Sequence, residues 1–366
     1  RRHGSYGVYP TLLETGKQMS FPTEPNTTQL PRRIVILGGG FAGVYTAKHL
    51  LKRCRRLPAE QQYEVHLVSR ENYMVFQPML AEVLSGSVGI ADTVSPLRRL
   101  APGAILHVCD IERIDLAGNK VVCLPGVRGR ALELEFDHLV IALGNVTDFR
   151  GMTGIAEHAM SFKTLGDAIT LRNHVLRLLE EAEAEPDAQF RGQMLTFVAA
   201  GGGFSGVEAI AELQDFVRRA VRQFRRFTLR DCRFILVHSH GRILPEMNES
   251  LATYAQKVLE KRGIEMVLNT RLVSATASEA VLKDGQRIAN RTLICTVPSH
   301  PNPVVAALDT SLKPVGGMDD RGKLLVDSTC LVNGMRNVWA LGDCAMVPLL
   351  DRASDSAVRY APPTAQ

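Results

Sequence analysis

Apolar residues in this chain gather in short continuous runs that alternate with segments of helical spacing. The runs predict buried strands at 34–37, 64–69, 136–143, 195–200, 233–238, 293–295 and 338–341, with shorter strand-like pieces at 104–122. The spaced segments predict helices at 41–54, 166–185, 204–216 and 250–262. Strands that alternate with helices favour parallel sheets. We therefore predict an α/β protein.

Two glycine turns of the same design join a predicted strand to a predicted helix. In each turn the first glycine permits a tight bend, the second lets the backbone approach a pyrophosphate, and the third lets the helix pack on the strand. These glycines are Gly38, Gly40 and Gly43 in the first turn and Gly201, Gly203 and Gly206 in the second. Phosphates then lie at the positive end of the helix dipole. Two such turns predict two dinucleotides and electron transfer between them.

Composition narrows the class of protein. The chain has 366 residues, of which 45% are apolar and 22% charged, which leaves room for two or three globular domains. The printed residues contain neither an uninterrupted apolar run of membrane-spanning length nor a secretory signal, so we expect an intracellular protein. Residues 1–30 show no periodicity and predict a loose leader, with Met19 as an alternative start. None of the seven cysteines forms a C-x-x-C motif, which argues against a redox-active dithiol.

The net charge of +5 is concentrated in one basic amphipathic segment, Phe216 to Arg230, which holds six arginines among apolar residues at helical spacing. We interpret the segment as a helix with a buried apolar face and a solvated basic face. Contact with anionic lipid headgroups stays an alternative. We expect no nucleic-acid partner, because no recognition motif accompanies the charge.

Taken together, the motifs resemble those of type II NADH dehydrogenases, within the flavoproteins of pyridine nucleotide-disulfide reductase fold. The resemblance runs from about Arg32 to the last residue. Its pieces are GGGFAG, NYMVFQPMLAEVLSG (72–86), FDHLVIALGNVTDF (136–149), KTLGDAITLRN (163–173), GGGFSGVE (201–208), RNVWALGDCAMVP (336–348) and PPTAQ (362–366). It implies FAD at the first turn and NADH at the second. It also implies two Rossmann-like domains, the second inserted in the first: an FAD domain of residues 31–160 and 291–366, and a NAD(P)H domain of residues 161–290.

The resemblance also assigns site residues. Glu208 would lie near the nicotinamide and flavin and orient the hydride donor or handle protons; its plain alternative is a first-turn acid that complements the helix dipole. Gln366 would lie under the isoalloxazine ring, where the family continues into the quinone pocket, so we expect this sequence to be a fragment. Asp343 follows an aliphatic strand and can accept a hydrogen bond from a ribityl hydroxyl, while Gly342 allows close approach. The remaining cofactor-binding predictions are Phe41, Ala42, Ser69, Arg70, Gln77, Ile111, Ala142, Gly144, Phe204 and His238.

Three places depart from the family pattern. Ser69 stands where the fold usually places a carboxylate on the adenosine ribose, with Glu71 as an alternative partner. The matching place in the second unit is His238, and Arg242 follows nearby. An arginine there accommodates the 2′-phosphate of NADP, so NADPH stays an alternative to NADH. The third departure is the stretch 296–299, where the family more often has an alanine–glycine turn.

The expected activity is hydride transfer from NADH to FAD, then transfer of two electrons to a membrane quinone without proton pumping. Peripheral attachment to the cytoplasmic face of the cell membrane is expected through the region beyond Gln366, and a homodimer stays open. One alternative is a soluble reductase of the same fold that reduces oxygen or an iron–sulfur protein. Another is a redox sensor that binds nucleotide and FAD without catalysis. We assign no metal site.

Overall fold

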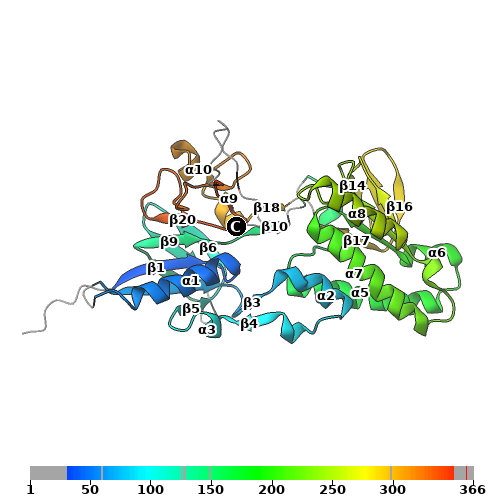
Figure 1. Cartoon of the computed structure of the whole chain (residues 1–366), viewed down its shortest axis with the longest axis horizontal. Helices are drawn as coiled ribbons and strands as arrows, with labels where there is room; N and C mark the ends of the chain where they lie inside the picture. Colours follow the sequence, from blue (N-terminus) through cyan, green and yellow to red (C-terminus); the bar gives the residue numbers. More distant parts are fainter. Residues whose placement is uncertain are drawn as a thin grey trace, which may run out of the picture. The chain divides into compact units, whose positions relative to one another are not determined.

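The computed structural model describes residues 31–58, 61–124, 126, 129–147, 149, 151–296, 299–349 and 360. The chain divides into Arg1–Pro31 and Arg32–Gln366, and the elements below belong to the second unit. That unit is mixed α/β and is built around two parallel sheets, as the pattern of strands and helices predicted (Figure 1).

The first sheet has the strand order β20-β9-β1-β2-β5, with every neighbouring pair parallel. Its strands are β1 (Arg32–Leu37), β2 (Tyr63–Ser69), β5 (Ile105–Val108), β9 (His138–Ile141) and β20 (Val338–Ala340). Alternate residues of β1 point to opposite faces of the sheet. Ile34 and Ile36 belong to one buried cluster, and Val35 and Leu37 belong to another. Both faces are covered, which explains why β1 is a continuous apolar run.

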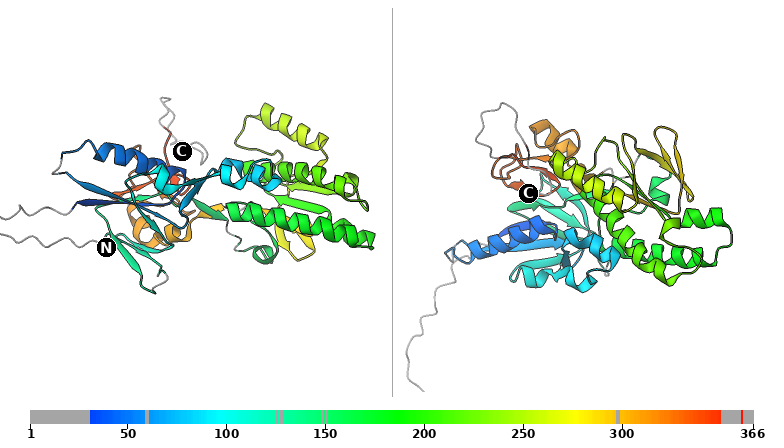
Figure 2. Two further views of the ribbon diagram at one scale, coloured as in Figure 1. Left: turned by 90° about the horizontal axis from the view of Figure 1, so that it is seen from below. Right: turned by 45° about the vertical axis from the view of Figure 1, so that its right-hand side comes forward.

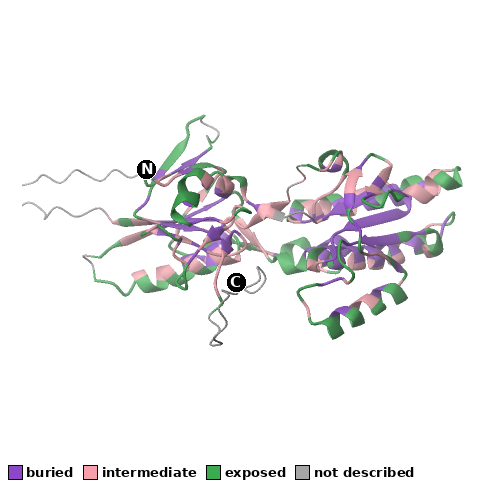
Figure 3. Ribbon diagram, turned by 90° about the horizontal axis from the view of Figure 1, so that it is seen from above, coloured by how far each residue is buried: buried purple, intermediate pink, exposed green. Residues whose placement is uncertain are grey.

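The second sheet has the strand order β13-β12-β11-β17, again all parallel. Its strands are β11 (Thr196–Ala200), β12 (Arg233–Val237), β13 (Ile264–Val267) and β17 (Thr292–Cys295). Phe197 is fully buried and stacks on Phe234 with ring centroids 5.2 Å apart. Its neighbour Val198 lies in a different buried cluster on the other face. Every residue of β11 and β17 is buried, as is β12 after Arg233, whereas the edge strand β13 is only partly buried; the buried strands are purple in Figure 3.

The chain passes from the first sheet to the second and back. It leaves the first sheet after β9 and returns to it at β20, so the strands of the second sheet lie in sequence between these two strands of the first. β10 (Asn145–Thr147) pairs antiparallel with β18 (Ser299–Pro301), one strand on the outward passage and one on the return. We predicted that the FAD domain resumes at residue 291, and this boundary needs a correction. β17 pairs with β11, so Thr292–Cys295 belongs to the second sheet.

The principal helices follow the sheets: α1 (Phe41–Cys54), α5 (Leu165–Ala184), α7 (Phe204–Ala220) and α8 (Glu249–Lys261). The other helices are α2 (Leu80–Ser85), α3 (Leu97–Leu100), α4 (Ile155–His158), α6 (Ala188–Met194), α9 (Pro303–Ala306) and α10 (Asp309–Leu312), with 3-10 turns η1 (Gln77–Met79), η2 (Ile90–Asp92), η3 (Val221–Gln223), η4 (Leu229–Asp231) and η5 (Lys313–Val315). The other strands are β3 (Tyr73–Val75), β4 (Val94–Pro96), β6 (Ile111–Asp115), β7 (Lys120–Cys123), β8 (Leu132–Glu135), β14 (Leu272–Ala275), β15 (Glu279–Leu282), β16 (Arg287–Ala289), β19 (Leu324–Leu325) and β21 (Ala345–Met346).

Helix α2 joins the two halves of the architecture. Its residues come from the connection between β2 and β5 of the first sheet, yet it packs against α5 and α7, which flank the second. Leu80 and Leu84 are buried in the same cluster as Phe197. Figure 2 shows this short cyan helix beside the green helices in both views.

The basic amphipathic segment is not one helix, so the prediction of a helix is wrong beyond Ala220, where α7 ends. Phe227 is buried and Phe224 stacks on it, with ring centroids 5.0 Å apart. Glu183 accepts hydrogen bonds from the backbone N–H groups of Arg225 and Arg226, which stabilises the non-helical backbone there. The apolar residues thus face the core, as predicted, without a continuous helix.

A pair of histidines joins β2 to β5 and makes stability depend on pH. His66 Nδ1 lies 2.9 Å from His107 Nε2, and the rings stack with centroids 5.2 Å apart. Burial and the neighbouring His66 lower the pKa of His107. Its neutral form is therefore favoured in the folded state, whereas the unfolded chain takes up the proton near pH 6.5.

We expect the contribution of His107 to the urea midpoint to be constant above about pH 7, to fall as the pH drops from about 6.5 to the lower folded pKa of His107, and to change no further below it. In His107→Phe, which cannot take up this proton, the fall between pH 7.5 and 5.5 should be smaller. Titrations of both proteins over this range measure the difference. Equal falls would contradict the assignment, because other titrating groups are common to both.

No helix among the described residues is long and apolar enough to cross a membrane.

Candidate functional site

The first glycine turn lies between β1 and α1, at the carboxyl end of the first sheet. Gly38 has φ +113°, which favours glycine, and a Cβ there would collide with the Ala142 carbonyl oxygen. A Cβ at Gly43 would collide with the carbonyl oxygen of Gly38. Gly40, by contrast, has extended backbone and no atom within 4 Å of an added Cβ. Gly38 and Gly43 are therefore required by the fold, while Gly40 opens onto free space in front of the helix.

The second turn repeats this design between β11 and α7. Gly201 has φ +124°, and a Cβ at Gly206 would collide with the carbonyl oxygen of Gly201. Gly203 is extended, and the nearest atom to its added Cβ is Glu246 Oε1 at 3.7 Å. Neither Gly40 nor Gly203 is followed by an acid in the first helical turn, so the free N–H groups there have no negative partner on their own helix. Both helix starts fit a pyrophosphate.

Each turn contains three consecutive glycines, and the second of the three, Gly39 or Gly202, packs on a residue at or just after the end of the next strand. A Cβ at Gly39 would lie against the Ser69 side chain, and one at Gly202 would lie against the His238 ring. The Gly202 N–H donates to His238 Nδ1 over 3.0 Å. Ser69 and His238 are thus equivalent residues of the two units, as their places in the sequence predicted, and both are buried.

Further predicted FAD residues meet at the carboxyl ends of β9 and β20. Leu341 N–H donates to the Ile141 carbonyl, which brings the Gly342–Asp343 turn beside Ala142. Gly342 has φ +79°, and an added Cβ would lie 3.2 Å from the Ala42 Cβ. Gly144 has φ +62°, with no atom within 4 Å of an added Cβ. Asp343 is half-buried at this edge, where a ribityl hydroxyl could reach it.

The other predicted FAD residues are more scattered. Gln77 Nε2 donates to the Lys163 carbonyl over 3.4 Å, which ties η1 to the start of α5. Phe41 meets Phe76 edge to face, with ring centroids 5.5 Å apart. Arg70 is exposed and forms an ion pair with Glu71. Ile111 begins β6, directly after the loop that follows β5.

Glu208 lies on α7 and faces α2. The helix begins at Phe204, so Glu208 is its fifth residue and the first turn holds no acid. The expectation that Glu208 lies in the first turn is therefore wrong, and the helix dipole does not account for it. Loss of solvent around its carboxyl group and the negative charge of Glu82 raise the pKa of Glu208. Glu82 Oε2 is buried without a hydrogen-bond partner in the described part of the chain.

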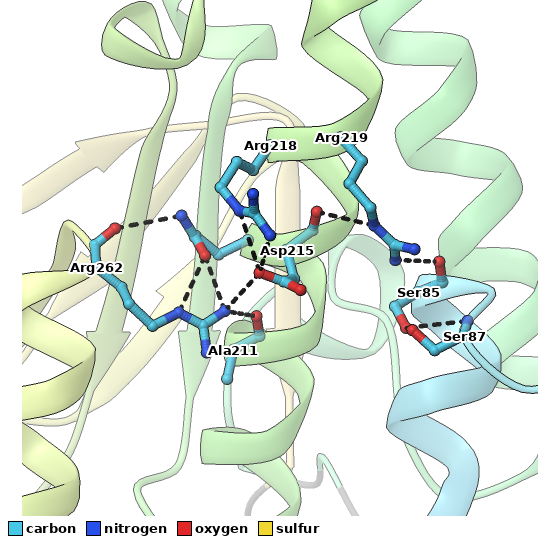
Figure 4. A network of polar contacts seen from close by, with 8 residues as sticks. Ser85, Ser87, Ala211, Asp215, Arg218, Arg219 and Arg262 are labelled. Carbon is cyan, nitrogen blue, oxygen red and sulfur yellow. Dashed lines mark hydrogen bonds and ion pairs between the residues drawn. The ribbon is translucent and has the colours of Figure 1, made fainter.

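A polar network holds α2 against α7 (Figure 4). Arg219 donates to the Ser85 carbonyl at the end of α2 over 2.8 Å. One turn earlier, Asp215 pairs with Arg218 at 2.9 Å and with Arg262 at 3.3 Å. Burial disfavours ionisation of Asp215, but the hydrogen bond and charge of Arg218 and the charge of Arg262 hold its pKa below the ordinary value. Of these contacts, the Arg219–Ser85 hydrogen bond joins α7 to α2, while the Asp215–Arg262 pair joins α7 to the end of α8.

Some predicted site positions lie outside the described residues. These are Gln366 and two residues of the 296–299 departure, Val297 and Pro298. In contrast, the structure adds Glu82, Glu246 and Thr270, which sequence reasoning missed. Glu82 stands within the quoted 72–86 motif, but its neighbour Glu208 is 126 residues away in sequence, and local pattern carries no sign of that contact.

Comparison with known proteins gives the class. The sequence profile of the pyridine nucleotide-disulphide oxidoreductase family matches residues 32–361, and the chain belongs to this family. Type II NADH:quinone oxidoreductase NdhA of Mycobacterium tuberculosis is 28% identical over 352 residues, which cover 92% of this chain and 71% of the relative. An external alternative NAD(P)H-ubiquinone oxidoreductase of Arabidopsis thaliana is 28% identical over 330 residues, 86% of this chain and 55% of the relative.

Among solved structures, NDH2 of Plasmodium falciparum in complex with NADH superposes with a TM-score of 0.76 at 20% identity, covering 87% of this chain and 65% of that one. This likeness supports the fold alone: two Rossmann-like units, the second inserted in the first, as predicted. The family pairs FAD with a pyridine nucleotide, and the two glycine turns are the places in this fold that suit them.

Proposed function

We propose that the chain takes hydride from a reduced nicotinamide nucleotide onto FAD and passes two electrons to a quinone without pumping protons. The repetition of one phosphate-binding turn in two parallel sheets carries this proposal, because it provides for two dinucleotides in one chain. The names of the mycobacterial and plant relatives support the quinone as acceptor.

For the FAD, the proposed residues are those around the first turn. Gly40 leaves room for the pyrophosphate, the N–H groups that open α1 donate to it, and Asp343 accepts from a ribityl hydroxyl. When bound, the flavin accepts hydride from the nicotinamide and releases two electrons. Ser69 offers one hydroxyl to the adenosine ribose, with Arg70, Gln77, Ile111, Ala142 and Gly144 at the edges of the same site. We propose domain limits near residues 31–160 and 296–366 for this unit.

For the nicotinamide nucleotide, the proposed residues are Gly201, Gly203, Phe204, Gly206 and His238. We propose that Glu208 holds a proton beside the reacting rings. Loss of solvent around its carboxyl group and the charge of Glu82 raise the pKa of Glu208, although the residue as a whole is exposed. A raised pKa favours a role in proton transfer. The resemblance also supports a place for Gln366 at the acceptor side, and peripheral attachment to the cytoplasmic face of the membrane.

Stopped-flow spectroscopy of the FAD-loaded protein tests the proposal. Under anaerobic conditions NADH should bleach the flavin absorbance, and a short-chain quinone should restore it faster than oxygen or ferredoxin does. The variant Glu208→Gln keeps the size of the side chain but removes its ability to exchange a proton. We expect its turnover to fall by roughly tenfold to a hundredfold and its pH profile to lose one limb. Glu212→Gln on the same helix is the matched control. Flavin that does not bleach with NADH or NADPH would contradict the proposal.

A further inference from the structure

Two cysteines that are separated in sequence by β6 and its turn lie together where the chain leaves β5. Cys109 follows β5 directly, and Cys123 is the last residue of β7. Ile111 stands opposite Cys123 in the antiparallel ladder of β6 and β7. The Leu124 N–H donates to the Asp110 carbonyl over 2.8 Å, which extends this pairing toward Cys109. The two thiols are thereby brought into hydrogen-bond contact with each other.

The two thiols differ in their access to solvent. Cys123 is 0% exposed and belongs to the buried cluster that also contains Val35. Cys109 packs against the same cluster but is only half-buried, and the residues on either side of it, Val108 and Asp110, are exposed. A small solute can therefore reach Cys109, whereas Cys123 is shielded from solvent and has Cys109 within its reach.

The contact also gives the two thiols different chemistry. A hydrogen bond donated by Cys123 lowers the pKa of Cys109, although burial and the charge of Asp110 act in the opposite direction. The same contact, together with burial, raises the pKa of Cys123. In the other two half-buried cysteines, Cys54 and Cys330, burial raises the pKa. Because the thiolate is the reactive form, Cys109 is the nucleophile of the pair and Cys123 keeps its proton.

We propose that Cys109 and Cys123 are a reversible redox pair, in which hydrogen peroxide converts the two thiols to a disulfide. The Cys109 thiolate attacks one peroxide oxygen, so that an S–O bond forms, the O–O bond breaks, and the leaving hydroxide takes up a proton to become water. The Cys123 thiol then attacks the sulfur of this sulfenic acid. The S–S bond forms, the S–O bond breaks, and the hydroxide leaves with the proton of Cys123 as water. Two thiols are oxidised, and one peroxide is reduced to two waters.

The place of the pair links it to the first glycine turn. The Cys109 N–H donates to the Ser69 carbonyl over 3.0 Å, and Ser69 in turn packs on Gly39. A disulfide would close the chain from Cys109 to Cys123 into a ring and so restrain the backbone beside Ser69. The sequence gives no sign of such a pair, because the two thiols meet only through the pairing of β6 with β7.

Thiol counting after mild oxidation tests the pair. The FAD-loaded chain, without any reduced nucleotide, is treated with a small excess of hydrogen peroxide, then unfolded and titrated for free thiols. We expect two of the seven thiols to be lost and to return with dithiothreitol, and peptide mass mapping to find one disulfide, between Cys109 and Cys123. Cys109 should react about tenfold faster than Cys54 or Cys330, because its thiolate fraction is larger. An unchanged thiol count, or a disulfide between other cysteines, would overturn the inference.

Three variants separate the roles of the two thiols. In Cys123→Ala, Cys109 should react more slowly and stop at the sulfenic acid, which dimedone labels. In Cys109→Ser, the buried Cys123 should stay a free thiol. Cys330→Ser is the matched control, since it removes a half-buried cysteine outside the pair and should still form the disulfide. Thermal midpoint and flavin content show that each variant is folded. If the oxidised wild type carried dimedone on Cys109 beside a free Cys123, the two thiols would not be a pair and the inference would fail.

Discussion

Gly40→Val is expected to fold like the wild type and to purify without flavin. An added side chain at Gly40 meets no protein atom within 4 Å, and its extended backbone suits valine, so the protein itself has no reason to be destabilised. The same side chain fills the space in front of the N–H groups that open α1. A charge-assisted hydrogen bond contributes about 1.5–3 kcal/mol. Loss of one or two such bonds should weaken FAD binding by roughly a hundredfold or more.

The measurement is the ratio of flavin absorbance to protein, followed by titration with FAD. Gly43→Val is the matched comparison in the same turn, because its side chain would collide with the Gly38 carbonyl and with no ligand. That variant should lower the free energy of unfolding by about 1–3 kcal/mol or more. Gly40→Val with full flavin content would show that the first turn does not hold a pyrophosphate.

Gly203→Val should keep the flavin and lose the nicotinamide nucleotide. Its added side chain meets one flexible neighbour, Glu246, at 3.7 Å, so the fold should be unaffected. We expect nucleotide affinity to fall by roughly a hundredfold for the same reason as at Gly40. Flavin reduction at low nucleotide concentration should fall in proportion, while dithionite should still reduce the flavin.

Together the two valine variants assign one nucleotide to each turn. Loss of flavin from Gly203→Val, or loss of nucleotide binding with retained flavin in Gly40→Val, would show that the assignment of the turns is reversed. Loss of both ligands from either variant, with a lowered thermal midpoint, would show that these glycines serve the fold rather than a ligand.

The contact between α2 and α7 also bears on function. It brings the charge of Glu82 near enough to Glu208 to raise its pKa, and the hydrogen bond from Arg219 to the Ser85 carbonyl joins the two helices (Figure 4). Two carboxyl groups that share one place resist double ionisation. The charge of Glu82, which comes from the connection between β2 and β5 of the first sheet, contributes to the raised pKa of Glu208.

The two glycine turns, the strands that precede them and the α/β class could all be predicted from the sequence alone. These features follow from local demands: only glycine tolerates φ +113° at Gly38, and only continuous apolar runs suit strands covered on both faces, as β1 and β11 are. The end of α5 before Pro186 was predicted for the same kind of reason.

The remaining features depend on contacts between residues that are far apart in sequence. Beyond the end of α7 at Ala220, Glu183 accepts hydrogen bonds from the non-helical backbone at Arg225 and Arg226. β17 belongs to the second sheet because β11, about a hundred residues earlier, offers it an edge. Glu82 raises the pKa of Glu208, and Thr270 N–H donates to the His238 carbonyl, only because separate elements pack together. Local periodicity indicates which residues are buried, but not which of them contact one another. The partners of each residue at this site were therefore determined by long-range packing.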